Sequence, residues 1–134
     1  MVKEKSEAKS NTKEIVRAAI EGIFKKKGKD PVSLDLTKIE NSAFKYFVIC
    51  HADSNTQVEA LADSVLETIK EETGEKAWHK EGITNATWVL LDYSDVVVHI
   101  FQKEYRDLYK LEELWADAKL THYNDNKKNG EKKE

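Results

Sequence analysis

The stretch W-V-L-L-D-Y-S-D-V-V-V-H-I-F-Q-K-E-Y-R-D-L-Y-K-L-E-E-L-W, residues 88–115, decides the fold. It contains two runs rich in β-forming residues on either side of a short polar turn, followed by a run with helical spacing. This order predicts a β-hairpin that leads into a helix. Acidic, aromatic and histidine side chains lie among the strand residues, and none stands at a known catalytic spacing. The pattern favours a protein that binds a partner over an enzyme that acts on a small molecule.

Alternation along these strands predicts which residues share a face. Trp88, Leu90 and Asp92 fall on one side of the first strand, and Asp95 and His99 fall on one side of the second. If the strands pair through the tight turn, we expect Asp92 near Asp95 and Trp88 near His99. A face that mixes an aromatic residue, a leucine and carboxylates is typical of a protein interface. The alternative is that Trp88 belongs to the core, as large aromatic residues mostly do.

Periodicity predicts the remaining elements. Helices are expected at about 11–27, 55–73 and 103–118, and strands at 32–37, 44–50, 76–81, 86–93 and 95–101. The order α-β-β-α-β-β-β-α predicts a single α/β domain with helices packed on a mixed sheet. The domain is expected to span 11–120, between a disordered tail at 1–10 and a polar C-terminal tail at 121–134.

Composition narrows the class of protein. A length of 134 residues suits one domain, and a net charge of −3 lacks the basic footprint of a nucleic-acid-coating protein. One cysteine excludes an internal disulfide and indicates a reducing compartment. The chain has no apolar run long enough to span a bilayer and no secretion signal. We therefore expect a soluble, cytoplasmic protein without membrane contact.

Candidate catalytic groups are sparse. The four histidines stand at no metal-ligand spacing, and the five glycines form no phosphate-binding loop, so we expect no metal and no cofactor. Asp92, Ser94 and His99 include the residue types of a triad but lack a nucleophile elbow. Asp92 and Asp95 are the strongest enzymatic candidates, although nucleotidyl transfer needs carboxylates on one strand face, typically two residues apart. Local turn bonding and partner binding are the alternatives for this pair.

Several segments of the sequence together resemble one known protein family. The segments W-V-L-L-D-Y-S-D-V-V-V-H-I-F and E-Y-R-D-L-Y-K-L-E-E-L-W-A-D-A resemble the ribosomal silencing factor family RsfS, also called Iojap. Upstream, L-D-L, F-V-I-C, S-N-T-Q-V, A-L-A-D-S-V and E-G fall in the expected order, so the likeness covers about residues 12–118.

The resemblance implies a nucleotidyltransferase-like fold without catalytic carboxylates, and hence no enzyme. It implies binding to the large ribosomal subunit through universal large-subunit ribosomal protein fourteen. Such binding would block subunit association and repress translation under nutrient limitation. Relatives in organelles act in large-subunit assembly, which is an alternative role, as is a nucleotidyltransferase-like enzyme using Asp92 and Asp95. A ribosomal RNA contact by the tails and a homodimer of the free protein are further possibilities.

Carried over by position, the implied partner-binding set lies in the hairpin and at the start of the last helix. It consists of Trp88, Leu90, Asp92, Asp95, His99, Glu104 and Arg106. Tyr109, Leu111, Leu114 and Trp115 are expected to be structural. The chain departs from the family pattern at Lys45, at His51 and at Ser94, where the family usually has glycine. A positive φ at Ser94 would therefore have to be avoided or tolerated.

Overall fold

The computed structural model describes residues 2–125, with side chains from residue 11 onward. The helices are α1 (Val2–Lys25), α2 (Asn55–Thr73), α3 (Lys103–Tyr109) and α4 (Leu111–Leu114). The strands are β1 (Lys29–Asp35), β2 (Tyr46–Ala52), β3 (His79–Glu81), β4 (Trp88–Asp92), β5 (Val96–Gln102) and β6 (Lys119–His122). They form one sheet in the order β3-β4-β5-β2-β1-β6, in which only β2 and β5 pair in parallel. This confirms the predicted α/β fold with a mixed sheet.

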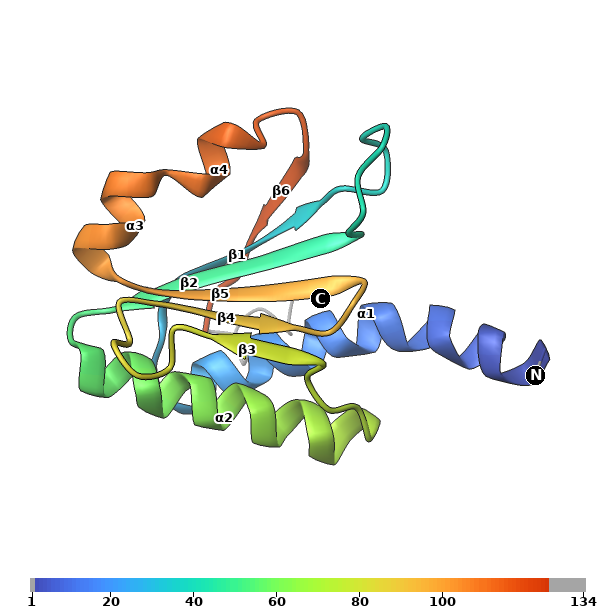
Figure 1. Ribbon diagram of the computed structural model, residues 1–134, viewed down its shortest axis with the longest axis horizontal. Helices are drawn as coiled ribbons and strands as arrows, with labels where there is room; N and C mark the ends of the chain where they lie inside the picture. The colour runs from blue at the N-terminus through green and yellow to red at the C-terminus, as the bar shows by residue number, and fades with distance from the viewer. Residues whose placement is uncertain (1, 126–134) are drawn as a thin grey trace.

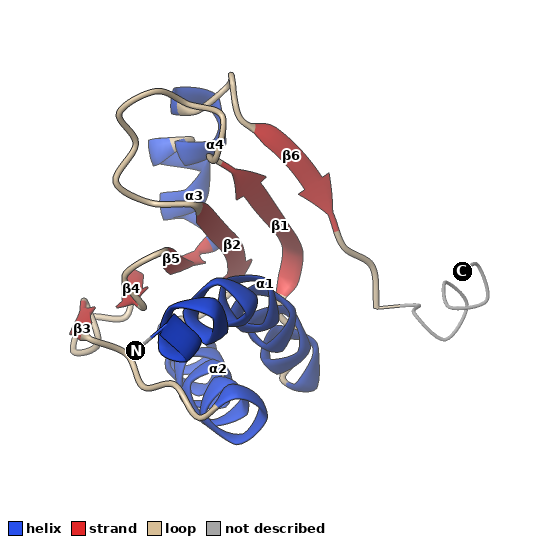
Figure 2. Ribbon diagram, turned by 90° about the vertical axis from the view of Figure 1, so that its right-hand side faces the viewer, coloured by secondary structure: helices blue, strands red, loops and turns tan. Residues whose placement is uncertain are grey.

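The sheet separates two unequal helical layers. The long helices α1 and α2 cover one face, and α3 and α4 lie over the other (Figure 1). Seen from the side, β6 forms the outer edge of the sheet, beyond the cover of either helical layer (Figure 2). The helices α1 and α2 approach closely at Gly22, where an added Cβ would lie 2.9 Å from the Cα of Val65. The larger core lies between these two helices and the sheet.

The helix α2 has the bounds that the sequence predicts, and both of its ends are capped. The hydroxyl of Ser54 accepts a hydrogen bond from the backbone N–H of Gln57 at 3.2 Å. Gly74 ends the helix at a φ of 81°, in the left-handed region that glycine tolerates best. Its buried stripe of Val58, Leu61 and Val65 packs into the larger core.

The hairpin forms, but in a different register from the expected one. Trp88 pairs with Phe101, Leu90 with His99, and Asp92 with Val97. The backbone N–H of Tyr93 donates to the carbonyl oxygen of Val96 at 2.8 Å, so the loop contains two residues. The expected pairs of Asp92 with Asp95 and of Trp88 with His99 were therefore wrong. The shift is two residues, so the paired strand residues keep their predicted faces, whereas Asp95 lies in the loop and does not.

Three elements differ from those that the sequence periodicity predicts. The helix α1 begins at Val2 instead of about Asn11, because the residues before Asn11 are mostly good helix formers. The side-chain amide of Asn11 donates to the carboxylate of Glu75 at 2.8 Å. The last helix breaks at Lys110, whose φ is 46°, so that 103–118 is not one helix. The strand β6 was missed, and residues 121–122, expected in the polar tail, pair with β1. The expected tail at 126–134 lies outside the described residues.

Ser94 adopts a φ of 78° in the hairpin loop, a conformation that a side chain disfavours. We expect Ser94→Gly to raise the free energy of unfolding by about 1 kcal/mol, because glycine relieves this strain. Chemical denaturation measures the change. Ser94→Ala keeps the Cβ and should not stabilise the protein; equal stabilisation by both variants would contradict the explanation.

Candidate protein interface

The strand β4 presents a partly exposed row on the face that carries α3 and α4. Trp88, Leu90 and Asp92 alternate with the fully buried Val89 and Leu91 along the strand. The neighbouring β3 places His79 beside Asp92 and Glu81 beside Leu90 in the sheet. All three residues of β3 are exposed, so this part of the sheet has no cover. We call the row Trp88, Leu90 and Asp92 the β4 row.

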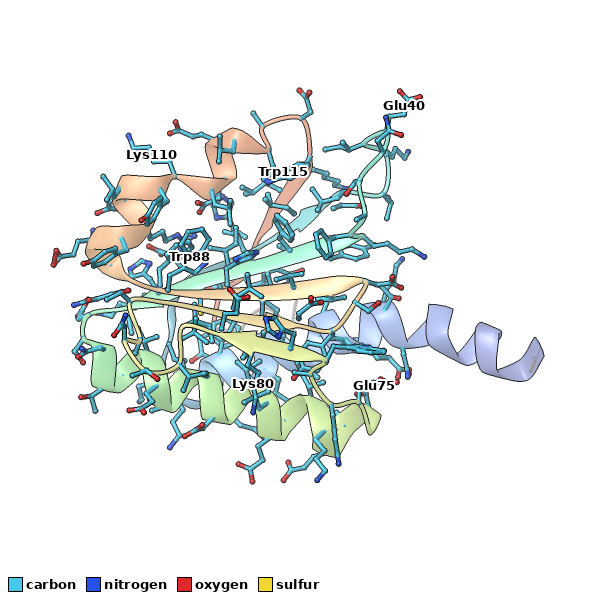
Figure 3. All side chains as sticks on the ribbon, in the orientation of Figure 1. Glu40, Glu75, Lys80, Trp88, Lys110 and Trp115 are labelled. Carbon is cyan, nitrogen blue, oxygen red and sulfur yellow. The ribbon has the colours of Figure 1, made fainter. Side chains whose placement is uncertain are left out.

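Trp88 is partly exposed at the surface and also packs against residues of the sheet and of α3. Its ring centroid lies 4.9 Å from that of Phe101 in the sheet and 4.9 Å from that of Tyr109 in α3. Its indole N–H donates to Nδ1 of His99 at 3.1 Å. Figure 3 shows Trp88 between the sheet and the α3–α4 segment, with Lys110 pointing outward. Half-buried Trp88 therefore joins the β4 row to the α3–α4 segment.

His99 lies beneath this surface and not on it. It is 4% exposed, and its ring meets the ring of Phe47 edge-on at 4.6 Å. Burial lowers the pKa of His99 to about 3, so the ring is neutral near pH 7. The bond from Trp88 to Nδ1 places the ring proton on Nε2, which has no partner within the described structure. His99 can position Trp88 but cannot itself contact a partner.

Arg106 is also internal. Its Nη1 donates to the carbonyl oxygen of Asp30 at 2.8 Å and to Nδ1 of His51 at 2.9 Å. Its Nε and Nη2 donate to Oε2 of Glu112 at 3.1 and 2.6 Å. With 8% of its surface exposed, Arg106 is not available as a direct contact, because these internal acceptors occupy it. It ties the α3–α4 segment to the start of β1 and the end of β2.

His51, one of the departures from the family pattern, completes this network. Burial and the adjacent Arg106 guanidinium lower the pKa of His51, which keeps the ring neutral and able to accept. Its departure from the family pattern therefore serves a buried contact.

The other predicted site residues lie at different places on the molecule. Glu104 is exposed on α3. Asp95 is partly exposed, but its carboxylate faces α1, where Oδ2 accepts from the Thr12 hydroxyl at 3.3 Å and lies 3.9 Å from Nζ of Lys45. Asp92 instead accepts the backbone N–H of Ser94 at 2.8 Å. The structure thus brings together Trp88, Leu90 and Asp92 but directs Asp95 toward the other layer.

Sequence reasoning missed an exposed apolar patch on the α3–α4 segment. Leu108 is 67% exposed, Leu114 74% and Tyr109 46%, whereas Leu111 is buried. Tyr109 and Leu114 were expected to be structural, because a continuous helix would carry one apolar stripe inward. The break at Lys110 interrupts that stripe. The signal available in the sequence was an excess of leucines over what one stripe can bury.

The groups that suggested catalysis do not converge. Asp92 and Asp95 bond to different neighbours, and across residues 2–125 no three His, Cys, Asp or Glu side chains form a metal-binding cluster. Burial raises the pKa of the Cys50 thiol to about 12, so it is a poor nucleophile. The arrangement suits contact between proteins better than covalent chemistry.

Comparison with known proteins gives the family. Residues 9–134 match the family model described as "RsfS: Ribosomal silencing factor during starvation". The chain belongs to the RsfS family. It is 41% identical over 110 residues to the ribosomal silencing factor RsfS of Bacillus subtilis, covering 82% of this chain and 92% of that protein. The chloroplast protein Iojap of Zea mays is 39% identical over 77 residues, which cover 55% of this chain and 32% of that protein.

Solved structures agree with this membership of RsfS. A crystal structure of a Chromobacterium violaceum protein superposes with a TM-score of 0.73 at 42% identity, covering 78% of this chain and 85% of that one. A Bacillus halodurans structure gives a TM-score of 0.66 at 37% identity, covering 77% of this chain and 94% of that one. None of the helices that the structure describes is long and apolar enough to cross a bilayer.

The buried histidines make stability depend on pH. The pKa of His99 falls from about 6.5 in the unfolded chain to about 3 in the fold, so the unfolded chain binds more protons between these values. The contribution of neutral His99 to the free energy of unfolding is largest above about pH 6.5 and falls as the pH drops. We expect a loss of about 1.4 kcal/mol per pH unit from His99 alone between about pH 6 and 5.

Chemical denaturation across this pH range measures the slope. His99→Asn keeps an acceptor for the Trp88 indole and removes the titrating ring, so its slope should be shallower than that of the wild type. His122→Asn, on the exposed strand β6, controls for the loss of a histidine. Identical slopes for wild type and His99→Asn would refute the assignment.

Proposed function

We propose that this RsfS family member binds the large ribosomal subunit, blocks its association with the small subunit and thereby represses translation. The observation that carries the proposal is the partly exposed β4 row, which Trp88 connects through Tyr109 to the α3–α4 segment with its exposed leucines. The chain also matches the silencing-factor family along most of its length. Universal large-subunit ribosomal protein fourteen is the proposed contact, and nutrient limitation is the proposed setting. Binding alone is sufficient for this function, and no catalytic step is proposed.

The composition of the surface supports a protein partner. Trp88 and Leu90 are partly buried in β4, and the ring of Trp88 packs against Tyr109 of α3. Leu108 and Leu114 of the α3–α4 segment project into solvent. Central aromatic and aliphatic anchors within a polar rim are typical of interfaces with a few dominant contacts. Leu108 and Leu114 have little intramolecular reason to be so exposed, since burial of a leucine side chain is favourable by about 2 kcal/mol.

The charges of the surface support a basic partner. Asp92, Glu81 and Glu104 lie on or beside this face. Carboxylates at a rim accelerate association with a basic surface and fix its orientation more than they add affinity. A ribosomal protein that contacts ribosomal RNA elsewhere suits this complementarity. Binding should therefore weaken as the salt concentration rises.

Co-sedimentation with purified large ribosomal subunits tests the proposal. The wild type should pellet with the subunits at micromolar concentration. Leu114→Glu should reduce pelleting by about tenfold or more, because it places a charge in an apolar contact without disturbing the core. Asp92→Asn keeps the hydrogen bond to Ser94 and removes the charge, so it should mainly reduce the dependence on salt.

A matched control lies on the opposite layer. Glu71→Lys changes an exposed residue of α2 and should pellet like the wild type. A wild type that stays in the supernatant would overturn the ribosomal proposal. Equal loss in Leu114→Glu and Glu71→Lys would overturn the assigned face.

A second copy is the alternative occupant of the same face in the free protein. The exposed leucines of the α3–α4 segment favour it, because apolar patches tend to self-associate. Sedimentation velocity of the wild type and Leu114→Glu separates the two. A dimer that dissociates only in the variant would show that the free protein covers this face with itself.

A further inference from the structure

A groove on the opposite layer follows from the width of the sheet. Strands lie about 4.8 Å apart and packed helices about 10 Å apart, so two helices cover about four strands. The sheet has six strands, and α1 and α2 leave the outer side of β1 and β6 open. The result is a cavity of about 650 Å³ between α1, β1, β2 and β6. This volume is in the range of small-molecule sites.

The lining of this groove fits a small polar molecule better than a third helix. Along α1 the floor is apolar, with Val16, Ile20 and Phe24. Along β1 and β6 the wall is polar, with Ser33 and Thr121. An added helix would need an apolar surface on both sides to bury its stripe.

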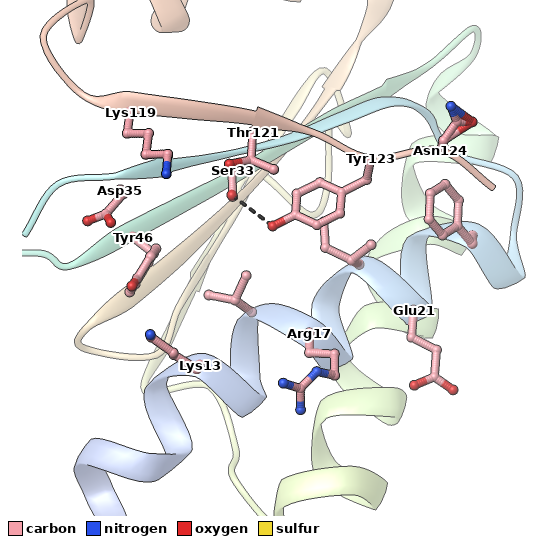
Figure 4. A pocket seen from close by; sticks show the side chains of 13 residues that line it. Lys13, Arg17, Glu21, Ser33, Asp35, Tyr46, Lys119, Thr121, Tyr123 and Asn124 are labelled. Carbon is pink, nitrogen blue, oxygen red and sulfur yellow. Dashed lines mark hydrogen bonds between the residues drawn. The ribbon is translucent and has the colours of Figure 1, made fainter. Parts of the chain in front are cut away.

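The ring of Tyr123 is held in place within the groove. Its hydroxyl hydrogen-bonds to the hydroxyl of Ser33 at 3.0 Å, and its backbone N–H donates to the carbonyl oxygen of Pro31 at 3.0 Å. Figure 4 shows the ring in the middle of the cavity, above α1, with its hydroxyl pointing toward Ser33. A fixed aromatic ring above an apolar floor offers a stacking surface for a flat ligand.

The two ends of the groove differ in charge. Lys13 and Lys119 come from opposite walls at one end, Arg17 follows along α1, and Glu21 and Asn124 mark the other end (Figure 4). Asp35 also lies at the cationic end: its Oδ1 accepts from the N–H and the hydroxyl of Thr37 at 2.9 and 2.6 Å, and these bonds, with the charge of Lys119, lower its pKa. Lys13, Arg17 and Lys119 outnumber this one carboxylate, so the end keeps a net positive charge that favours an anion.

We propose that this groove binds a nucleoside monophosphate whose base carries an exocyclic amine. The phosphate would lie between Lys13, Arg17 and Lys119, the base would stack on Tyr123, and the amine would donate to Glu21 or Asn124. About 12 Å of helix separates Lys13 from Glu21, which is the scale of a base, a sugar and one phosphate. The site is independent of the proposed ribosomal face, because the sheet lies between them.

Isothermal titration calorimetry of the full chain with adenosine 5′-monophosphate tests the proposal. Saturable binding in the micromolar to millimolar range is expected. Lys119→Glu should weaken it by about tenfold or more, because it replaces a charge-assisted contact with a repulsion. Lys26→Glu is the matched control: it makes the same charge change at an exposed position just past α1, outside the groove, and should leave binding unchanged.

Two further ligands test the recognition of the base. Inosine 5′-monophosphate lacks the amine and inorganic phosphate lacks the base, so both should bind more weakly than adenosine 5′-monophosphate. Absence of saturable binding at millimolar ligand would overturn the proposal. Equal binding of phosphate or inosine monophosphate, or equal weakening by Lys26→Glu, would also overturn it. Lys119→Glu should still pellet with large ribosomal subunits, which separates this proposal from the ribosomal one.

Discussion

The buried guanidinium of Arg106 is the interaction on which the second face of this protein depends. It joins β1, β2 and the α3–α4 segment through the carbonyl of Asp30, the ring of His51 and the carboxylate of Glu112. Loss of one partner from such a buried pair costs about 3–5 kcal/mol, because the remaining charge stays desolvated. Two such short helices would not be stable alone, so they depend on this anchor and on their packing against the smaller core. The exposed leucines lie on the segment that this anchor holds against the sheet.

One face of the sheet stabilises the fold, and the other leaves side chains accessible to a partner. On one face, α1 and α2 bury a continuous apolar core that supplies most of the hydrophobic stabilisation. On the other, the smaller core beneath α3 and α4 leaves the β4 row and the leucines of the α3–α4 segment accessible. A partner can therefore bind one face while the other maintains the fold. The groove beside β6 exists for a related reason, because the first layer is narrower than the sheet.

The candidate site was predictable only in part. Trp88, Leu90 and Asp92 follow from simple alternation, which depends on the chain itself. His99 and Arg106 share the same segment but are internal, because residue type and spacing do not reveal which side chains a later helix will cover. Asp95 turns toward Thr12 and Lys45, which are distant in sequence. Leu108 and Leu114 were missed because the sequence expectation was one continuous helix, which the conformation at Lys110 interrupts.

The sequence by itself determined the α/β class, the bounds of α2, the faces of the hairpin and the family, because these depend on local periodicity, caps and residue order. Tertiary structure alone decided the register of β4 on β5, the break at Lys110 and the strand β6. These features depend on free-energy differences between alternatives that are locally almost equivalent. A weakly β-forming segment becomes a strand when β1 offers unpaired backbone groups, and a helix breaks when Arg106 and Leu111 gain buried partners. Such gains arise from residues far apart in the chain, and no local pattern contains them.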